Sequence, residues 1–214
     1  MTIQVKICGL KTEAMLDAAL DAGADYVGLV LFRKSPRNVS NAEARRLANH
    51  ARGRAKIVVL TVDPSDELVR TIAGDIGPDL IQLHGHETVQ RVAEVMRSSG
   101  LLVLKAIGVA TAADVAAARA YHAVTPRILF DAKPPAGHDA SLPGGNGLAF
   151  DRRALSAWHG GWYMLAGGLT ATNVAEAIRL TRAPAVDVSS GVESAPGVKD
   201  ARLIRAFMRA AKSA

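Results

Sequence analysis

Hydrophobic and polar positions follow two alternating patterns along this chain. Eight short runs rich in β-branched and apolar residues are separated by stretches with the spacing of amphipathic helices. We expect strands in these runs, at residues 3–8, 25–31, 56–62, 79–84, 101–107, 127–132, 162–167 and 185–191. Strands that alternate with helices in this way are typical of repeated βα units and of a parallel sheet.

Several of the intervening helices have recognisable starts. Ser40 and Glu43 have the spacing of a capping box at the beginning of the helix after the second strand. Asp151 and Thr170 stand where an N-cap is expected, before the helices that follow the sixth and seventh strands. An Ala-rich stretch at 112–120 is also expected to be helical.

The number of βα units decides the expected fold class. No linker or change of composition divides the chain, so we expect a single domain over residues 1–214. Eight units in one domain fit an α/β fold of the (β/α)8 TIM barrel type with short loops. The alternative, an open doubly wound sheet, requires a glycine-rich first turn such as GxGxxG, which the sequence lacks. The longest connections, 32–40 and 132–147, directly follow strands and therefore belong to the C-terminal face of the barrel.

Side-chain alternation predicts which polar residues face the barrel interior. In the first strand Lys6 and Cys8 share one face, whereas Val5 and Ile7 share the other. The apolar face should contact the helices, which turns Cys8 inward at the upper end of its strand. By the same alternation, polar groups of four strands converge on one mouth: Cys8 from the first, Gln82 and His84 from the fourth, Asp131 from the sixth, and Asp187 and Ser189 from the eighth.

Each of these groups also has a purely structural interpretation. A lone strand cysteine such as Cys8 is more often inert packing than a reactive thiol, and a strand-end aspartate such as Asp131 often caps a turn. For His84 we expect a structural or substrate contact rather than a metal site, because no second ligand stands at metal spacing on its face. Lys6 can either pair with Asp187 inside the barrel or face a substrate.

Glycine-rich turns after the last two strands predict an anion site. In many barrels these two loops hold a phosphate with backbone N–H groups and a helix N-terminus. A single turn of this kind is more often just a tight connection between a strand and a helix. Two such turns in adjacent units favour a sugar phosphate or phosphoribosyl ligand. The candidate residues are Gly167, Gly168, Ser189, Ser190 and Gly191, and the turn GGNG, with Gly145 and Asn146, is expected to close over the same ligand.

Charge and composition constrain the partners. The net charge is +6, with basic residues concentrated at 45–56. Few aromatic residues are available for stacking on bases, so a solvated helix face is favoured over a nucleic-acid site. The chain begins without a signal-peptide pattern and has no apolar run of about 18 residues, so we expect a cytoplasmic protein without membrane contact.

Seven short motifs, in order along the chain, resemble one enzyme family. The motifs KICGL, SPR, QLHG, LFDA, GGNG, LAGGL and DVSSGVE are similar to those of the phosphoribosylanthranilate isomerases of tryptophan biosynthesis. KICG together with DVSSGVES and PGVKD is highly specific. The resemblance implies a (β/α)8 barrel that catalyses an Amadori rearrangement without cofactor or metal. In that aldose–ketose isomerisation, N-(5-phosphoribosyl)anthranilate becomes 1-(2-carboxyphenylamino)-1-deoxyribulose 5-phosphate.

The resemblance also implies roles for individual residues. Cys8 corresponds to the family's general base, Asp131 to its general acid, and Arg37 to the residue that pairs with the anthranilate carboxylate. Asn146 stands where the family commonly has a small hydroxyl residue, although an amide can still donate a hydrogen bond. A thiol has an ordinary pKa of about 8.5, so we expect Lys6 to lower the pKa of Cys8 modestly.

Two other functions remain open at this stage. One is a related sugar-phosphate isomerase, such as the histidine-pathway aminoaldose isomerase, which is expected to use aspartates at the ends of strands one and five. Here strand one ends in Cys8. The other is a barrel that binds a phosphate ligand without turnover. Both a monomer and a homodimer are compatible with the Ala-rich helices, since these can pair with a second copy or simply cover the barrel.

Overall fold

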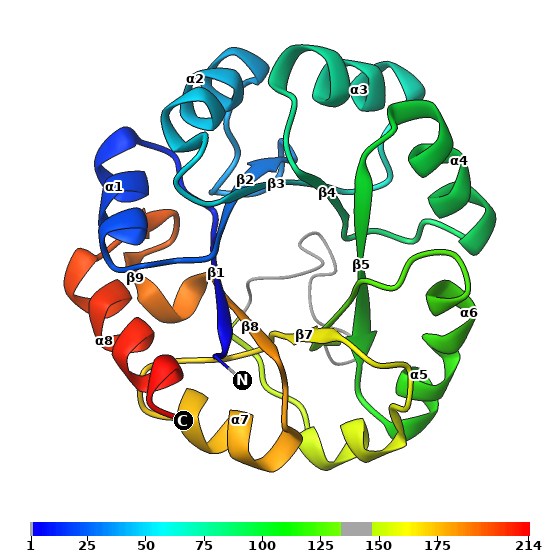
Figure 1. Cartoon of the computed structure of the whole chain (residues 1–214), viewed down its shortest axis with the longest axis vertical. Coiled ribbons are helices and arrows are strands. Elements are labelled where there is room, and N and C mark those ends of the chain that lie inside the picture. The colour runs from blue at the N-terminus through cyan, green and yellow to red at the C-terminus, as the bar shows by residue number, and fades with distance from the viewer. Residues whose placement is uncertain (1, 134–146) are drawn as a thin grey trace.

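Parallel strands close into a barrel in the computed structural model, which describes residues 2–133 and 147–214. The strands follow one another around the barrel in chain order, and β1 (Gln4–Cys8) pairs with β8 (Ala185–Val188) to close it (Figure 1). The others are β2 (Tyr26–Leu31), β3 (Lys56–Thr61), β4 (Leu80–Leu83), β5 (Leu102–Val109), β6 (Ile128–Ala132) and β7 (Tyr163–Leu165). The (β/α)8 barrel expected from the sequence is confirmed.

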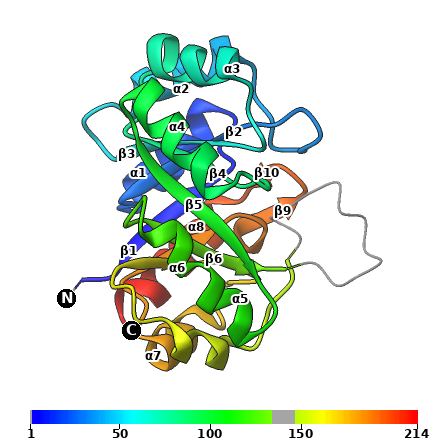
Figure 2. The ribbon, with the colours of Figure 1, turned by 90° about the vertical axis from the view of Figure 1, so that its right-hand side faces the viewer.

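Helices form a ring around the strands (Figure 1). They are α1 (Glu13–Asp21), α2 (Asn41–Ala51), α3 (Asp66–Thr71) with a π-helical turn (Ile72–Ile76), α4 (Val89–Ser99), α5 (Ala112–Ala117), α6 (Arg119–His122), α7 (Val174–Thr181) and α8 (Ala201–Lys212). Within the described residues, the remaining elements are two 3₁₀ helices (Arg152–Ala157 and Ser190–Val192) and an antiparallel pair, β9 (Glu193–Ala195) and β10 (Val198–Lys199). Figure 2 shows β9 and β10 at the opposite end of the barrel from the two chain termini.

The helix starts agree with the sequence only in part. Ser40 and Glu43 form the expected capping box of α2, in which the Ser40 N–H donates to Glu43 Oε2 at 2.7 Å. Asp151 accepts from the Arg153 N–H as an N-cap would, but the segment it precedes is a 3₁₀ helix rather than an α-helix. The interpretation of Asp151 as a cap is therefore right, and the helix type is wrong.

The helix after β7 begins later than Thr170 suggested. Asn173 Oδ1 accepts from the Thr170 N–H at 2.9 Å, and Asn173 Nδ2 donates to the Gly168 carbonyl at 2.9 Å. These bonds fold the segment into a turn, and α7 starts only at Val174. The expected cap at Thr170 is wrong because the same residues are used to close the glycine turn.

The alternation predicted along β1 is confirmed. Val5 and Ile7 belong to the apolar layer between strands and helices. Lys6 is fully buried, and its Nζ donates to Asp187 Oδ1 at 3.0 Å. Asp187 is the residue of β8 that pairs with Lys6 in the strand register. The inward faces of β1 and β8 thus place the charged pair Lys6–Asp187 inside the barrel. A second apolar cluster fills the rest of the barrel around Val58 and Leu129.

The basic stretch around α2 is paired with acidic residues of α1. Arg46 contacts Glu13, and Arg54 donates to Asp17 at 2.8 Å and to Asp21 at 3.2 Å. These pairs favour the solvated-helix interpretation of the stretch. Among the described residues, no helix is long and apolar enough to cross a membrane.

Candidate active site

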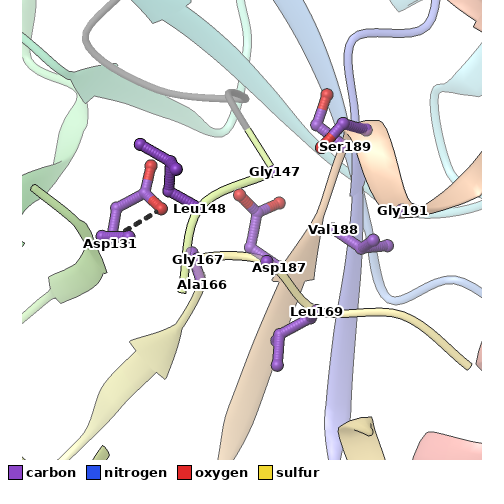
Figure 3. A pocket seen from close by; sticks show the side chains of 13 residues that line it. Asp131, Gly147, Leu148, Ala166, Gly167, Leu169, Asp187, Val188, Ser189 and Gly191 are labelled. Carbon is purple, nitrogen blue, oxygen red and sulfur yellow. Dashed lines mark hydrogen bonds between the residues drawn. The ribbon is translucent and has the colours of Figure 1, made fainter. Parts of the chain in front are cut away.

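A pocket opens at the C-terminal ends of β6, β7 and β8 (Figure 3). It encloses about 420 Å³, including space open to solvent. Its walls include Asp131, Asp187 and the five residues predicted to form the anion site: Gly167, Gly168, Ser189, Ser190 and Gly191. The structure therefore brings the predicted acid and both glycine turns to one place, on the face where barrels of this kind carry their chemistry.

Close backbone contacts explain the glycines of this pocket. A Cβ at Gly191 would lie 1.9 Å from the carbonyl oxygen of Leu169, and one at Gly168 would lie 2.8 Å from that of Leu148. Gly168 also has φ +60°, in the left-handed region that glycine adopts without strain. The turns after β7 and β8 thus lie against one another at Gly191, where a side chain would force them apart, whereas a side chain at Gly168 would push the turn after β7 away from residues 147–148.

Cys8 is buried at the end of β1, beside a glycine of the neighbouring strand. Its register partner is Gly28, where a Cβ would lie 2.8 Å from Cys8 Sγ, so the missing side chain makes room for the thiol. Burial raises the pKa of Cys8, and the positive charges of Lys6 and Lys199 lower it by less, so the pKa lies above its usual value. The expectation that Lys6 would lower it overall is wrong, because removal of water from the thiolate outweighs the attraction.

Lys6 and Asp187 form a buried ion pair next to this thiol. Their charged atoms are 3.0 Å apart, and the Lys6 side chain is 0% exposed. Burial lowers the pKa of Lys6, but the Asp187 carboxylate and Cys8 raise it by more, so Lys6 remains charged. Of the two interpretations that the sequence left open, the structure supports the pairing of Lys6 with Asp187.

Asp131 is the penultimate residue of β6, and its carboxyl contacts the next backbone N–H and His84, which directly follows β4. Its Oδ1 accepts from the Ala132 N–H at 2.8 Å, and its Oδ2 lies 3.3 Å from His84 Nε2. His84 Nδ1 is in turn 2.9 Å from Gln82 Nε2. Alternation predicted that Gln82 and His84 share a face, but the contact of His84 with Asp131 depends on the relative placement of β4 and β6, the two neighbours of β5.

Arg37 lies over the end of β1 and forms a bidentate pair with Glu193. Its Nε donates to Glu193 Oε1 and its Nη2 to Glu193 Oε2, both at 2.8 Å. A Cβ at Gly9 would lie 2.6 Å from Arg37 Cδ, so the absence of a side chain at the glycine that follows Cys8 lets the arginine pass over the end of β1. Sequence reasoning missed Glu193, although it closes the quoted motif DVSSGVE.

The predicted loop residues and possible metal ligands are the remaining features of the site. Gly145 and Asn146 lie outside the described residues, so their role stays a prediction. Within residues 2–133 and 147–214, no group of three or more His, Cys, Asp or Glu side chains could hold a metal ion.

Comparisons with known proteins agree with this geometry. Residues 5–210 match the family model of N-(5'phosphoribosyl)anthranilate (PRA) isomerase. An N-(5'-phosphoribosyl)anthranilate isomerase of Rhodopseudomonas palustris (strain BisB18) is 55% identical over 214 residues, which cover 100% of this chain and 97% of the relative.

Solved structures of the same enzyme superpose closely on the barrel. The crystal structure of phosphoribosyl anthranilate isomerase from Thermotoga maritima has a TM-score of 0.87 and 32% identity, covering 99% of this chain and 100% of the other. A second, in complex with reduced 1-(o-carboxyphenylamino)-1-deoxyribulose 5-phosphate, has a TM-score of 0.84 and 31% identity with the same coverage of 99% and 100%. By sequence and by structure, the chain belongs to the N-(5'-phosphoribosyl)anthranilate isomerase family.

Proposed function

We propose that this chain isomerises N-(5'-phosphoribosyl)anthranilate to 1-(2-carboxyphenylamino)-1-deoxyribulose 5-phosphate with Cys8 as the base and Asp131 as the acid. The activity is that of its family, and one related structure holds the reduced form of this product. The observation that carries the proposal is the common pocket of Asp131 and the two glycine turns. An acid at that position can reach a ribose whose phosphate is bound between the turns.

The first step of the proposed mechanism opens the ribose ring. Asp131 gives its proton to the ring oxygen, the bond between that oxygen and C1 breaks, and the amine lone pair forms an iminium with C1. The carboxyl needs a fixed direction for this transfer. The Ala132 N–H and His84 hold it from two sides, which supports the assignment.

The second step moves a proton from carbon. The iminium acidifies the hydrogen on C2, the Cys8 thiolate removes it, and an enolamine forms. The enolamine then gains a proton at C1 and loses the proton of its 2-hydroxyl group, which gives the ketone and leaves the acid and the base as they began. Because burial raises the pKa of Cys8, the positive charges around it are needed to provide enough thiolate.

Arg37 keeps its predicted role toward the anthranilate carboxylate. Its side chain packs against Gly9, the residue that follows the proposed base, and the aromatic carboxylate is attached close to the reacting carbon. A planar guanidinium can pair with both oxygens of a carboxylate, so it fixes the direction of the aromatic ring as well as its place.

Growth of a tryptophan auxotroph that lacks this isomerase tests the proposed function. The wild-type gene is expected to restore growth without tryptophan, and the purified protein to remove the fluorescent substrate in a continuous assay. Binding of the reduced product analogue with no turnover would instead indicate a binding barrel. Turnover only of a histidine-pathway aminoaldose would favour the related isomerase, although Cys8 at the end of β1 argues against that enzyme.

Gly191→Ala is expected to lower kcat/KM by roughly hundredfold, the size of effect that a shift of about 1 Å in a binding group can produce. The new methyl group would overlap the Leu169 carbonyl, which is 1.9 Å from the Cβ position, and the two phosphate turns would have to separate. Steady-state kinetics should show the loss mainly as a higher KM, because the turns bind substrate and take no part in proton transfer.

A matched substitution controls for the added methyl group. Gly74 has no atom within 4 Å of its Cβ position and lies in the π-helical turn after α3, so Gly74→Ala should leave kcat/KM near the wild-type value. Equal kinetics for both variants would contradict the assignment of the turn at Gly191 to the phosphate.

A further inference from the structure

A buried lysine that the proposed mechanism does not use connects several parts of the site. Lys199 of β10 has a side chain that is 0% exposed. Its Nζ donates to Glu193 Oε1 at 2.7 Å, to the Ser189 carbonyl at 3.0 Å and to Ser189 Oγ at 3.2 Å. An ammonium group has three N–H donors, so these acceptors engage all of them and fix the direction of the group.

The partners of Lys199 are themselves bonded to the proposed catalytic and binding groups. Glu193 accepts both N–H bonds of the Arg37 pair, at 2.8 Å each. Ser189 Oγ donates to the Cys8 carbonyl at 3.1 Å, and Ser189 also lines the phosphate pocket. Lys199 is therefore linked to the Arg37 guanidinium through Glu193 and to the end of β1 through Ser189.

Burial of the Lys199 ammonium group disfavours its charged form at this position. Burial lowers the pKa of Lys199, and Glu193 and Cys8 restore only part of the difference, so the pKa is below its usual value. Glu193, between two cations, has a lowered pKa despite its own burial. Apolar side chains of similar size often replace a buried ion pair without loss of stability, so stability alone does not account for a buried charge at Lys199.

We propose that Lys199 is a positioning residue that fixes the carboxylate-binding guanidinium of Arg37 relative to the end of β1 at Cys8. The inference rests on the proposed function, because it uses the roles assigned there to Arg37 and Cys8. Lys199 acts through Glu193 on the first and through Ser189 on the second. Without its ammonium group the Arg37–Glu193 pair loses its link through Lys199 to Ser189, and the position of the guanidinium relative to the strand end is less well defined.

A purely structural role makes a different prediction. If Lys199 only fastened the β9–β10 pair to the barrel, its loss would lower stability and would affect all ligands alike. If it positions Arg37, its loss must weaken recognition of the anthranilate carboxylate in particular. The ratio of affinities for ligands with and without that carboxylate separates these two roles.

The test uses Lys199→Met, which keeps a long unbranched side chain and removes the charge and the donors. Two probes are titrated into the full-length protein: reduced 1-(o-carboxyphenylamino)-1-deoxyribulose 5-phosphate and the same compound made from aniline, which lacks the carboxylate. We expect the wild-type preference for the carboxylated probe to fall by about tenfold, the typical effect of losing one hydrogen bond to a charged group. An unchanged preference in the folded variant would overturn the proposal.

Lys212→Met is the matched control. Lys212 also donates to a carbonyl and a carboxylate, Ile3 O at 2.8 Å and Asp25 Oδ2 at 2.7 Å, but at the opposite end of β1. It should leave the preference at the wild-type value.

Glu193→Gln keeps the inference testable if Lys199→Met does not fold. The amide has nearly the same size but cannot form the charged pair with Arg37, so the same preference should fall. Wild-type protein that neither turns over the substrate nor prefers the carboxylated probe would defeat the proposed function, and this inference with it. Wild-type turnover with an unchanged preference in the folded variants would defeat the inference alone.

Discussion

Cys8→Ala is expected to reduce kcat by roughly 10²- to 10⁴-fold, the usual contribution of a general base, while the barrel remains folded. The alanine keeps the Cβ and removes only Sγ, which faces the open position at Gly28, so the substitution leaves the strand pairing in place. Loss of substrate fluorescence measures the rate, and binding of the reduced product analogue shows that the site is intact. Near-normal turnover by Cys8→Ala would remove the thiol from the mechanism.

The raised pKa of Cys8 also gives the expected pH dependence. The thiolate is the active form and exists above the pKa, so ionisation of Cys8 should contribute to the kcat/KM profile a limb that rises with pH through neutrality and toward alkaline pH. Cys8→Ser should remove this limb of the profile, because a hydroxyl does not ionise in that range. Profiles of the same shape for wild type and Cys8→Ser would show that ionisation of the thiol does not control the rate, because kcat/KM reports the ionisations of the free enzyme.

Asp131→Asn is expected to lower kcat by roughly 10²- to 10⁴-fold with little change in binding of the reduced analogue. The amide has the shape of the carboxyl but cannot supply an acidic proton to the ring oxygen. Because ring opening precedes the step that uses Cys8, this variant should accumulate no iminium, whereas Cys8→Ala should still allow the ring to open. Rapid-mixing absorbance measurements on the two variants distinguish these cases.

Asp17→Asn serves as the control for the loss of a carboxylate that contacts a histidine. Asp17 lies 2.8 Å from His50 on the outer surface, between α1 and α2, so its replacement should leave kcat unchanged. Activity of Asp131→Asn within a few-fold of wild type would show that another group protonates the ring oxygen.

Local patterns in the sequence were sufficient to predict the barrel and the inward direction of its polar side chains. The two-residue period of a strand is set by the backbone alone, so Lys6 and Cys8 could be placed on one face without knowledge of their neighbours. The glycine turns could be assigned for a similar reason, since βα connections at the end of a barrel have a known place in the fold. Their mutual contact at Gly191 and Leu169 required coordinates.

Helix boundaries and helix types were less predictable, and the reason is visible at Asn173. Its side chain bonds to Thr170 and Gly168, so residues 170–173, which the capping pattern assigned to the start of the helix, form a turn that closes the glycine loop. The position of the helix start depends on the competition between side-chain-to-backbone hydrogen bonds in the turn and the backbone hydrogen bonds of the helix. The hydrophobic periodicity of the sequence does not predict that α7 begins at Val174.

The sequence by itself determined the strand–helix order, the face of each strand that carries polar groups, and, through its motifs, the family. Only the tertiary structure decided how those groups interact. Arg37 and Glu193 are 156 positions apart, and Lys199 joins them to Ser189 through contacts that no local pattern encodes. The raised pKa of Cys8 differs from the lowered value expected from the sequence for the same reason. Its direction depends on a balance between burial and surrounding charge, and both are set by the packing of segments distant in the chain.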